Sequence, residues 1–357
     1  GWDPAKERVN VKVAILGGTG LVGTEMISIL AERKFPLTEL VVFASERSRD
    51  RKLSTPFGDV ICRVAESQED FAGCDYVIID VDDPIALELA PLAAAAGARV
   101  IDKSAAFRMD KDVPLVIPEI NAADIADAKK GIVATPNCTT TVMLMAIAPL
   151  HAQFGLDRMV ISSYQSVSGA GQAGLDELRQ QWKEHAFDDE LESYVNSSKS
   201  ETLREGGGVW DKAIAGNVIP LAGSIKDGGY TSEEIKLVRE SQKILHDDTL
   251  RITATCVRVP VFVGHAMSVN ASFKNDIDAD VAAKVIADAP GVFLDTTDIA
   301  GTYPTPLDIA GIDDVHVGRL RNDTTQPNTI NFWVTGDNLR KGAALNAAQI
   351  LEHWEAM

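Results

Sequence analysis

The sequence predicts a two-domain α/β protein in which a parallel sheet is followed by a mixed, mainly antiparallel sheet. The chain has 357 residues, enough for two ordinary domains with separate cores. In its first third, short apolar runs alternate with helical segments, as is typical of a parallel sheet covered by helices on both faces. From about Met159 the runs lengthen and alternate with polar residues, which indicates an α+β domain.

The first domain is predicted from short strands rich in β-branched residues and from apolar helical segments. Strands are expected at residues 11–16, 40–44, 76–80 and 99–101, with helices from a glycine cluster to about residue 33 and at 85–96. A sheet of this kind binds its ligand at the carboxyl ends of its strands.

The second domain is predicted from longer alternating segments. Strands are expected at 251–259, 265–273, 315–320 and 329–335, and helices at 232–245 and 279–288. The polar, glycine-rich segment 190–208 is interpreted as a long loop or a dimer arm. A last helix, at about 339–354, is expected to pack back on the first domain.

Composition limits the possible functions. Hydrophobic residues make up 45% of the chain and charged residues 24%, which is typical of a globular protein. The net charge of −18 disfavours nucleic acid or an anionic membrane as a partner. The apolar stretch 142–150 is too short to cross a bilayer, and the N-terminus has no secretion-signal pattern, so a cytoplasmic location is expected.

The four cysteines form no C-x-x-C pair and no zinc-like spacing with histidine, so no metal site is predicted.

A glycine-rich loop follows the first predicted strand and opens a helix. Glycines permit a tight turn and let backbone N–H groups approach a pyrophosphate, while the helix N-terminus adds partial positive charge. A plain tight turn is the alternative. We predict a Rossmann-type dinucleotide-binding domain, with contacts from Gly17, Thr19, Gly20, Leu21 and Val22.

The residues after the second strand favour NADP over NAD. NAD sites usually place an acidic residue there for the ribose hydroxyls. Here Ser45, Arg47 and Ser48 offer hydroxyl and guanidinium groups that suit a 2′-phosphate. Glu46 argues against this assignment, and a solvated charged loop is the alternative.

Cys138 is the candidate nucleophile. It follows Pro136 and Asn137 and precedes an apolar run of helical length, so it is expected at a helix N-terminus. The partial positive charge at that position stabilises the thiolate, and so lowers the thiol pKa from its ordinary value of about 8.5. Exposed N–H groups there could also hold an oxyanion, worth about 10²–10³ in rate for each donor. Cys62 and Cys74 are interpreted as packing residues.

Arg258 and His265 flank the link between two predicted strands, which can bring both side chains to one end of a sheet. Arginine suits bidentate capture of a carboxylate, and histidine suits proton transfer near neutral pH. A structural histidine is the alternative. Cys256 shares a strand face with Arg258 and is expected near the site.

Glu233 and Lys236 are three residues apart on a predicted helix and so share a face. Thr231 and Glu234 fit a capping box, which gives Glu234 a structural role and leaves Glu233 without one. The alternative is a surface ion pair among Glu233, Lys236 and Glu240. For Arg108, which follows a strand, both a phosphate ligand and a solvated side chain are plausible.

Together these segments resemble aspartate-β-semialdehyde dehydrogenases of the bacterial kind. The matching segments span both predicted domains in order: GGTGLVG at 17–23, SAAFR at 104–108, PNCTT at 136–140, SSYQSVSGAG at 162–171, NVIPLAGS at 217–224, EEIK at 233–236, CVRVPVFVGH at 256–265 and DNLRKGAALNAAQI at 337–350.

The resemblance implies NADPH-dependent reductive dephosphorylation of β-aspartyl phosphate, in amino-acid biosynthesis toward lysine, threonine and methionine. It implies a homodimer or homotetramer, with an NADP-binding domain at 1–137 and 338–357 and a catalytic and dimerisation domain at 138–337. The implied roles are these: Cys138 as acylated nucleophile, His265 as general acid/base, Gln165 and Asn137 as orienting groups, Arg258 for the substrate α-carboxylate, Glu233 for its amino group, Arg108 and Lys236 for phosphate, and Ser168, Gly169 and Asn346 beside the nicotinamide.

Two departures from the family pattern affect the cofactor side. Residues 80–84 read DVDDP where a Ser/Gly-rich loop is common, and Asp102-Lys103 stands where Asn is usual. The nearest alternative function is another acyl-phosphate reductase, such as N-acetyl-γ-glutamyl-phosphate reductase. An inactive NADP-binding sensor is the alternative from another class, but it would not need Cys138, His265, Arg258 and Lys236 together.

Overall fold

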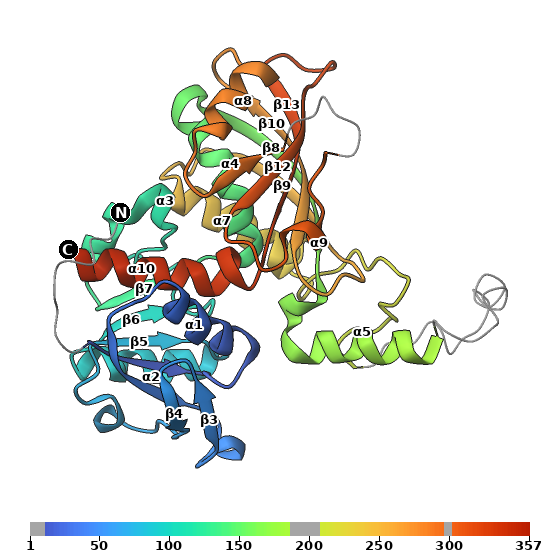
Figure 1. The fold of residues 1–357 in the computed structure, drawn as a ribbon. Helices are drawn as coiled ribbons and strands as arrows, with labels where there is room; N and C mark the ends of the chain where they lie inside the picture. Colours follow the sequence, from blue (N-terminus) through green and yellow to red (C-terminus); the bar gives the residue numbers. More distant parts are fainter. Residues whose placement is uncertain (1–10, 186–207, 296–301) are drawn as a thin grey trace. The chain divides into compact units, whose positions relative to one another are not determined.

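The computed structural model describes residues 11–185, 208–295 and 302–357, which divide into two compact units. Unit 1 comprises the described residues up to Thr141, with Arg239–Thr249 and Leu339–Met357. Unit 2 comprises the described residues of Val142–Val238 and Leu250–Asn338 (Figure 1). The predicted domain boundaries stay a prediction.

Unit 1 is built on a five-stranded sheet whose strand order is β2-β1-β5-β6-β7. All its strand pairs are parallel, as predicted. The strands are β1 (Val11–Leu16), β2 (Leu37–Phe43), β5 (Tyr76–Ile79), β6 (Arg99–Asp102) and β7 (Ile132–Ala134). Strand β7 was not predicted from the sequence, because it has only three residues and follows an irregular segment.

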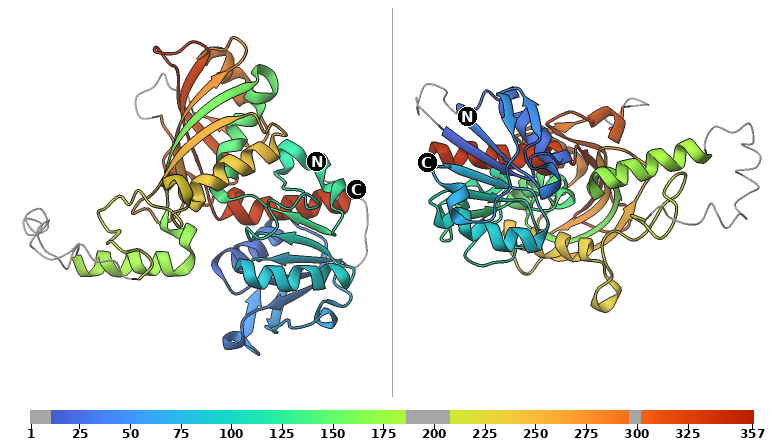
Figure 2. Two further views of the ribbon diagram at one scale, coloured as in Figure 1. Left: turned by 180° about the vertical axis from the view of Figure 1, so that it is seen from behind. Right: turned by 90° about the horizontal axis from the view of Figure 1, so that it is seen from below.

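Alternation along the strands places core residues on both faces of this sheet. Val13 and Ile15 of β1 belong to a core cluster that includes residues of α1 and α10, whereas Ala14 and Leu16 point to the other face. Helix α2 packs against β5 and β6, and its buried residues lie outside that cluster (Figures 1 and 2). The C-terminal helix therefore completes unit 1, as predicted. The helices are α1 (Leu21–Glu32), α2 (Asp83–Ala95), α3 (Pro118–Asn121) and α10 (Leu345–Ala356).

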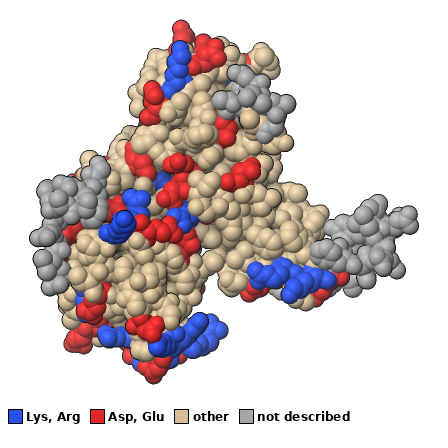
Figure 3. Space-filling model, in the orientation of Figure 1, with Lys and Arg blue, Asp and Glu red and all other residues tan. Residues whose placement is uncertain are grey.

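A small antiparallel hairpin follows β2. It pairs β3 (Lys52–Thr55) with β4 (Gly58–Ile61), and Lys52 forms a 2.6 Å ion pair with Asp59. Figure 3 shows that Lys and Arg side chains on this face lie beside Asp and Glu. Pairing of this kind neutralises opposite charges locally but leaves the net charge of the chain unchanged.

Unit 2 is built on a six-stranded mixed sheet of order β11-β12-β13-β10-β8-β9. Three of its strand pairs are antiparallel and two are parallel. The strands are β8 (Leu156–Gln165), β9 (Arg251–Arg258), β10 (His265–Phe273), β11 (Val292–Leu294), β12 (Val315–Asn322) and β13 (Thr329–Gly336). The helices of unit 2 are α5 (Gly171–His185), α8 (Ala279–Ala287) and α9 (Pro306–Ile309). Helices α4 (Cys138–Phe154) and α7 (Ser232–Ile244) have residues in both units. The predicted mixed sheet is confirmed, with β8 inserted between β9 and β10.

The helices of the described residues are all too short or too polar to cross a membrane. The predicted loop or dimer arm at 190–208 lies outside these residues, apart from Gly208.

Candidate active site

The glycine loop of unit 1 lies between β1 and α1, and its conformation requires glycine. Gly17 has φ +87°, and a side chain there would collide with the carbonyl oxygen of Asp80. A side chain at Gly23 would collide with the carbonyl oxygen of Gly17. Gly20 caps α1, so no side chain covers the first N–H groups of the helix, and no acidic residue lies in its first turn. The loop therefore fits a bound pyrophosphate.

The segment after β2 carries the predicted 2′-phosphate contacts. A 3₁₀ turn, Glu46–Ser48, follows Ser45. The carboxylate of Glu46 accepts two bonds from the guanidinium of Arg49, at 2.8 and 2.5 Å. This pairing lowers the pKa of Glu46 and neutralises the residue that argued against NADP. Ser45, Arg47 and Ser48 lie together on this exposed turn.

The two departures from the family pattern pair with each other. Asp80 follows β5, Lys103 follows β6, and the ammonium of Lys103 lies 3.0 Å from the carboxylate of Asp80. The Lys103 side chain is only 6% exposed. Because the backbone of Asp80 also contacts Gly17, this neutral pair lies beside the glycine loop.

Cys138 lies at the start of a helix, as predicted. It is the first residue of α4, and its side chain is partly exposed. Asn137 caps the helix, because its Oδ1 accepts from the N–H of Thr139 at 2.9 Å and its carbonyl accepts from the N–H of Thr141 at 2.9 Å. The other three cysteines are buried, which raises their thiol pKa values, that of Cys256 to about 12. Cys138 is thus set apart from them by position and exposure.

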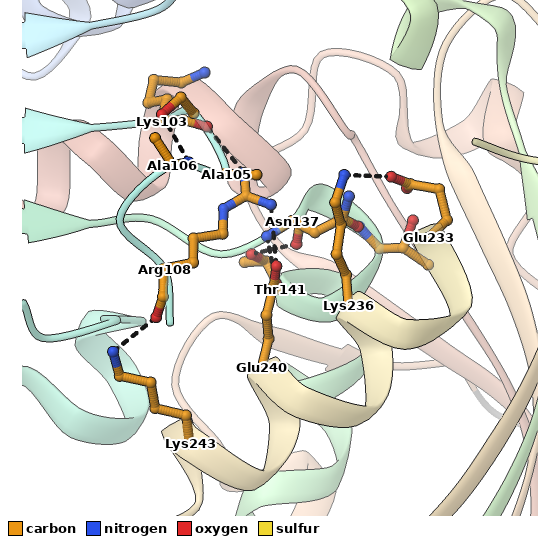
Figure 4. Close-up of polar contacts among 12 residues, drawn as sticks. Lys103, Ala105, Ala106, Arg108, Asn137, Thr141, Glu233, Lys236, Glu240 and Lys243 are labelled. Atoms are coloured by element: carbon orange, nitrogen blue, oxygen red, sulfur yellow. Dashed lines mark hydrogen bonds and ion pairs between the residues drawn. The ribbon is translucent and has the colours of Figure 1, made fainter. Parts of the chain in front are cut away.

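Arg108 is buried and paired, so of the two alternatives for this residue the solvated side chain is wrong. Its Nη1 donates to Oε1 of Glu240 at 3.0 Å, and its Nη2 donates to the carbonyl of Lys103 at 2.9 Å (Figure 4). Oε2 of Glu240 accepts from the N–H of Asn137 at 2.7 Å. The Nε of Arg108 is buried and has no hydrogen-bond partner among the described residues. An anion bound there would supply the missing acceptor.

Asn346 is held inside unit 1. Its side-chain amide donates to the carbonyl of Val116 at 2.9 Å and accepts from the ammonium of Lys341 at 3.0 Å. Lys341 in turn forms a 2.5 Å ion pair with Glu119. The position of Asn346 beside a nicotinamide stays a prediction.

His265 opens β10 in unit 2 and is fully buried. Its Nδ1 accepts from the backbone N–H of Ser166 at 3.1 Å. Because a backbone N–H can only donate, the neutral ring must carry its proton on Nε2. Burial lowers the pKa of His265 to about 3; the charge of Arg258 adds to this effect and that of Glu233 opposes it.

Arg258 and His265 approach the same backbone, as predicted from the ends of their strands. Gly169 lies between them: a methyl group there would lie 2.7 Å from Nη1 of Arg258 and 3.1 Å from the His265 ring. Gln165 pairs in register with Arg258 across β8 and β9. The strands of Arg258 and His265 are not neighbours, because β8 separates them. Gln165, Arg258 and His265 thus gather at one end of the sheet.

Ser166 and Asn338 are site-forming residues that the sequence analysis missed. Oδ1 of Asn338 accepts from the hydroxyl of Ser166 at 3.0 Å, that of Ser168 at 3.2 Å and the N–H of Gly264 at 2.9 Å. Ser166 also accepts a 2.6 Å bond from Arg258 at its carbonyl. Both residues lie in segments that carry the family resemblance, and this resemblance was the sequence signal that could have identified them.

The two adjacent glutamates at the start of α7 have different roles. Glu234 forms the predicted capping box with Thr231, through bonds of 2.7 and 3.3 Å, and also accepts from the N–H of Cys256 at 2.9 Å. Glu233 instead pairs with Lys236 at 2.8 Å (Figure 4). It also accepts from Nε2 of Gln165 at 3.4 Å. Of the alternative ion pair among Glu233, Lys236 and Glu240, only the Glu233–Lys236 part forms, whereas Glu240 pairs with Arg108.

Comparison with known proteins assigns both parts of the chain. Residues 12–128 match the model "Semialdehyde dehydrogenase, NAD binding domain" and residues 147–341 match "Semialdehyde dehydrogenase, dimerisation domain". An aspartate-semialdehyde dehydrogenase of Streptomyces akiyoshiensis is 45% identical over 96% of this chain and 98% of its own. The chain belongs to the aspartate-semialdehyde dehydrogenase family.

Other aspartate-semialdehyde dehydrogenases agree in sequence and in fold. The Aquifex aeolicus protein is 39% identical over 96% of this chain and 97% of its own. Aspartate semialdehyde dehydrogenase II of Vibrio cholerae, solved in complex with ASA, is 38% identical, with a TM-score of 0.88 over 98% of this chain and 99% of its own. The NAD-binding model includes the glycine loop, and the dimerisation model includes Gln165, Arg258 and His265.

Proposed function

We propose that this chain catalyses the NADPH-dependent reductive dephosphorylation of β-aspartyl phosphate, giving aspartate β-semialdehyde and phosphate. Membership of the aspartate-semialdehyde dehydrogenase family supports this reaction. The observation that carries the assignment is the position of Cys138 at the start of α4, on a turn capped by Asn137.

Cys138 forms the covalent intermediate. Its thiolate attacks the acyl carbon of the substrate, the C–O bond to phosphate breaks, and a thioester remains on Sγ. Backbone N–H groups in the first turn of α4 stabilise the oxyanion that forms. NADPH, when bound, supplies the hydride that reduces the thioester. Release of the aldehyde breaks the C–S bond and returns the electron pair to Cys138.

His265 acts as the acid/base group. With Nδ1 occupied by the N–H of Ser166, the proton on Nε2 is the one it can donate. The lowered pKa keeps the ring neutral at neutral pH, so Nε2–H donates to the substrate oxygen as charge develops. Asn137 and Gln165 orient the thiol region and the acyl group.

The remaining charged groups recognise the substrate and cofactor. Arg258 binds the α-carboxylate and Glu233 the amino group, while Arg108 and Lys236 bind phosphate. The buried Nε of Arg108 supports that role. NADP is held by the glycine loop and first turn of α1, by the turn after β2 and by residues beside the nicotinamide: Gly17, Thr19, Gly20, Leu21, Val22, Ser45, Arg47, Ser48, Ser168, Gly169 and Asn346.

The dimerisation domain of the family spans residues 147–341, which supports self-association. A homodimer or homotetramer is the proposed assembly. A cytoplasmic location stays a prediction. Among the alternatives, an N-acetylated substrate would leave Glu233 without an ammonium group to bind, which disfavours N-acetyl-γ-glutamyl-phosphate reductase.

A spectrophotometric assay tests the proposal. We expect continuous NADPH formation from aspartate semialdehyde and NADP⁺ only when phosphate is present, because without phosphate the reaction stops at the thioester after a single turnover. Cys138→Ala should abolish this activity. Replacing NADP⁺ by NAD⁺, or the substrate by N-acetyl-glutamate semialdehyde, should lower the rate strongly. Full activity of Cys138→Ala, or a preference for the N-acetylated substrate, would reject the assignment.

A further inference from the structure

We propose that Glu240 is a positioning residue whose single carboxylate fixes both the turn that carries Cys138 and the guanidinium of Arg108. Its kinetic consequences rest on the proposed function, in which Cys138 is acylated and Arg108 binds phosphate. All three residues, and Asn137, belong to unit 1. The contacts themselves do not depend on the identity of the reaction.

The two oxygens of the carboxylate have different partners. Oε2 accepts from the backbone N–H of Asn137 at 2.7 Å, and Oε1 accepts from Nη1 of Arg108 at 3.0 Å. Glu240 is only 1% exposed. Both bonds involve a buried charge, so each is stronger than a bond between neutral groups, and loss of either leaves a buried polar group unsatisfied.

The bond to Asn137 acts on the residue immediately before the nucleophile. The carbonyl of Asn137 accepts from the N–H of Thr141, and its side chain caps the N–H of Thr139. Glu240 holds the remaining backbone group of Asn137, its N–H. The peptide that leads into Cys138 is therefore fixed from both sides, which sets the direction of the thiol and of the first N–H groups of α4.

The bond to Arg108 sets the orientation of its guanidinium. Nη1 is held by Glu240 and Nη2 by the carbonyl of Lys103. The Nε–H is left buried without an acceptor in the described part of the chain. Glu240 thus occupies one part of the guanidinium fork and leaves Nε–H to an anion. Without this carboxylate the fork could rotate away from that anion.

A second residue of α7 holds the backbone near Arg108, so that the effect of Glu240 on side-chain orientation can be distinguished from an effect on folding. Lys243, three residues further along α7, donates to the carbonyl of Arg108 at 2.7 Å (Figure 4). It also donates to the carbonyls of Asp110 and Val113, both at 2.8 Å. These bonds hold the backbone that carries Arg108 without help from Glu240. Substitution of Glu240 is therefore expected to reorient two groups rather than to unfold the segment.

Kinetics of Glu240→Gln and Glu240→Ala test the proposal in the phosphate-dependent direction. We expect KM for phosphate to rise and kcat to fall, each about tenfold, with KM for NADP⁺ within twofold of wild type. Glu352→Gln is the matched control, because Glu352 is a buried carboxylate of unit 1 that binds Arg33 through two 2.7 Å bonds. Glu352→Gln should change thermal stability but neither KM for phosphate nor kcat. A phosphate KM within twofold of wild type in both Glu240 variants would overturn the proposal.

A double-mutant cycle distinguishes the effect of Glu240 through Arg108 from its effect through Asn137. In an Arg108→Ala background, Glu240→Ala should leave KM for phosphate unchanged, because the group through which it acts is gone. It should still lower kcat through Asn137. Additive effects on the phosphate KM would contradict the proposed route.

Hydrogen exchange tests the contact without any turnover. In the unliganded protein, peptides that contain Asn137 should exchange about tenfold faster in Glu240→Ala than in wild type, and at the wild-type rate in Glu352→Gln. Equal exchange in wild type and Glu240→Ala would overturn the positioning role. A wild-type enzyme without phosphate-dependent activity would reject the proposed function, and this exchange result would still decide the role of Glu240 at the Cys138 turn.

Discussion

The backbone N–H of Ser166 donates to Nδ1 of His265 at 3.1 Å, and both residues are fully buried. This bond determines which nitrogen carries the proton and holds the plane of the ring. Arg258 donates to the carbonyl of the same Ser166 at 2.6 Å. One peptide segment therefore orients both the acid/base group and the proposed carboxylate ligand.

The buried His265 should make stability depend on pH in a predictable direction. Its folded pKa of about 3 lies below the ordinary value of 6.5, so the unfolded chain binds more protons between these values. Stability from this residue is complete above about pH 6.5 and is lost as the pH falls toward 3. We expect wild type to lose roughly 1–2 kcal/mol more than His265→Asn between pH 7.5 and 5 in urea unfolding. Equal losses in the two proteins would show that the histidine is not held neutral.

The four cysteines should react with iodoacetamide at very different rates. Cys138 is partly exposed, whereas Cys62, Cys74 and Cys256 are buried and have raised thiol pKa values. Since the thiolate is the reactive form, we expect Cys138 to be labelled first and activity to fall in parallel. Peptide mapping by mass spectrometry measures this order. Labelling of another cysteine before activity is lost would contradict it.

Adjacent glutamates on α7 should give opposite phenotypes. Glu234→Gln loses one of the acceptors for the N–H groups of Thr231 and Cys256, so we expect about 1–3 kcal/mol less stability with kcat nearly unchanged. Glu233→Gln should keep stability within about 0.5 kcal/mol and raise KM for aspartate semialdehyde at least several-fold. Chemical unfolding and steady-state kinetics of the two variants form an internal control. The reverse pattern would show that the roles are wrongly assigned.

Gly169 should tolerate no side chain. A methyl group there would lie 2.7 Å from Nη1 of Arg258 and 3.2 Å from Nε2 of His265. Gly169→Ala must displace one of these groups, and we expect kcat/KM to fall by about 10–100-fold, since small displacements of reacting groups are costly. Thermal unfolding should change little, because the shift involves the end of a long side chain. Wild-type kinetics in this variant would indicate that catalysis does not depend on the positions of the Arg258 guanidinium and the His265 ring.

The fold was largely predictable because the strongest patterns are periodic and local. Strands β1, β2, β5 and β6 and the helix α7 appear where the sequence pattern placed them, and the capping box of Thr231 and Glu234 forms as its sequence signature requires. The three-residue strand β7 and the insertion of β8 between β9 and β10 were missed. Short strands carry little periodicity, and strand order depends on pairings distant in sequence.

The candidate site was predictable from the sequence for those residues whose side-chain type itself indicates a chemical role. Cys138, Arg258 and His265 belong to this class. Glu240 does not, because an exposed and a buried glutamate look alike on a helix, and its partners Arg108 and Asn137 lie 132 and 103 residues away. The pairing of Asp80 with Lys103 was missed for the same reason, although both ends had been noted as departures.

Peptide-mapping mass spectrometry gives the most direct test of the central claim, that an acyl group passes through Cys138. The enzyme is mixed with aspartate semialdehyde and NADP⁺ without phosphate, quenched in acid and mapped by peptide. The account predicts one aspartyl thioester, on the peptide that contains Cys138, which disappears when phosphate is added before the quench. NADPH formation with no adduct on Cys138, or with the adduct on another residue, would contradict it.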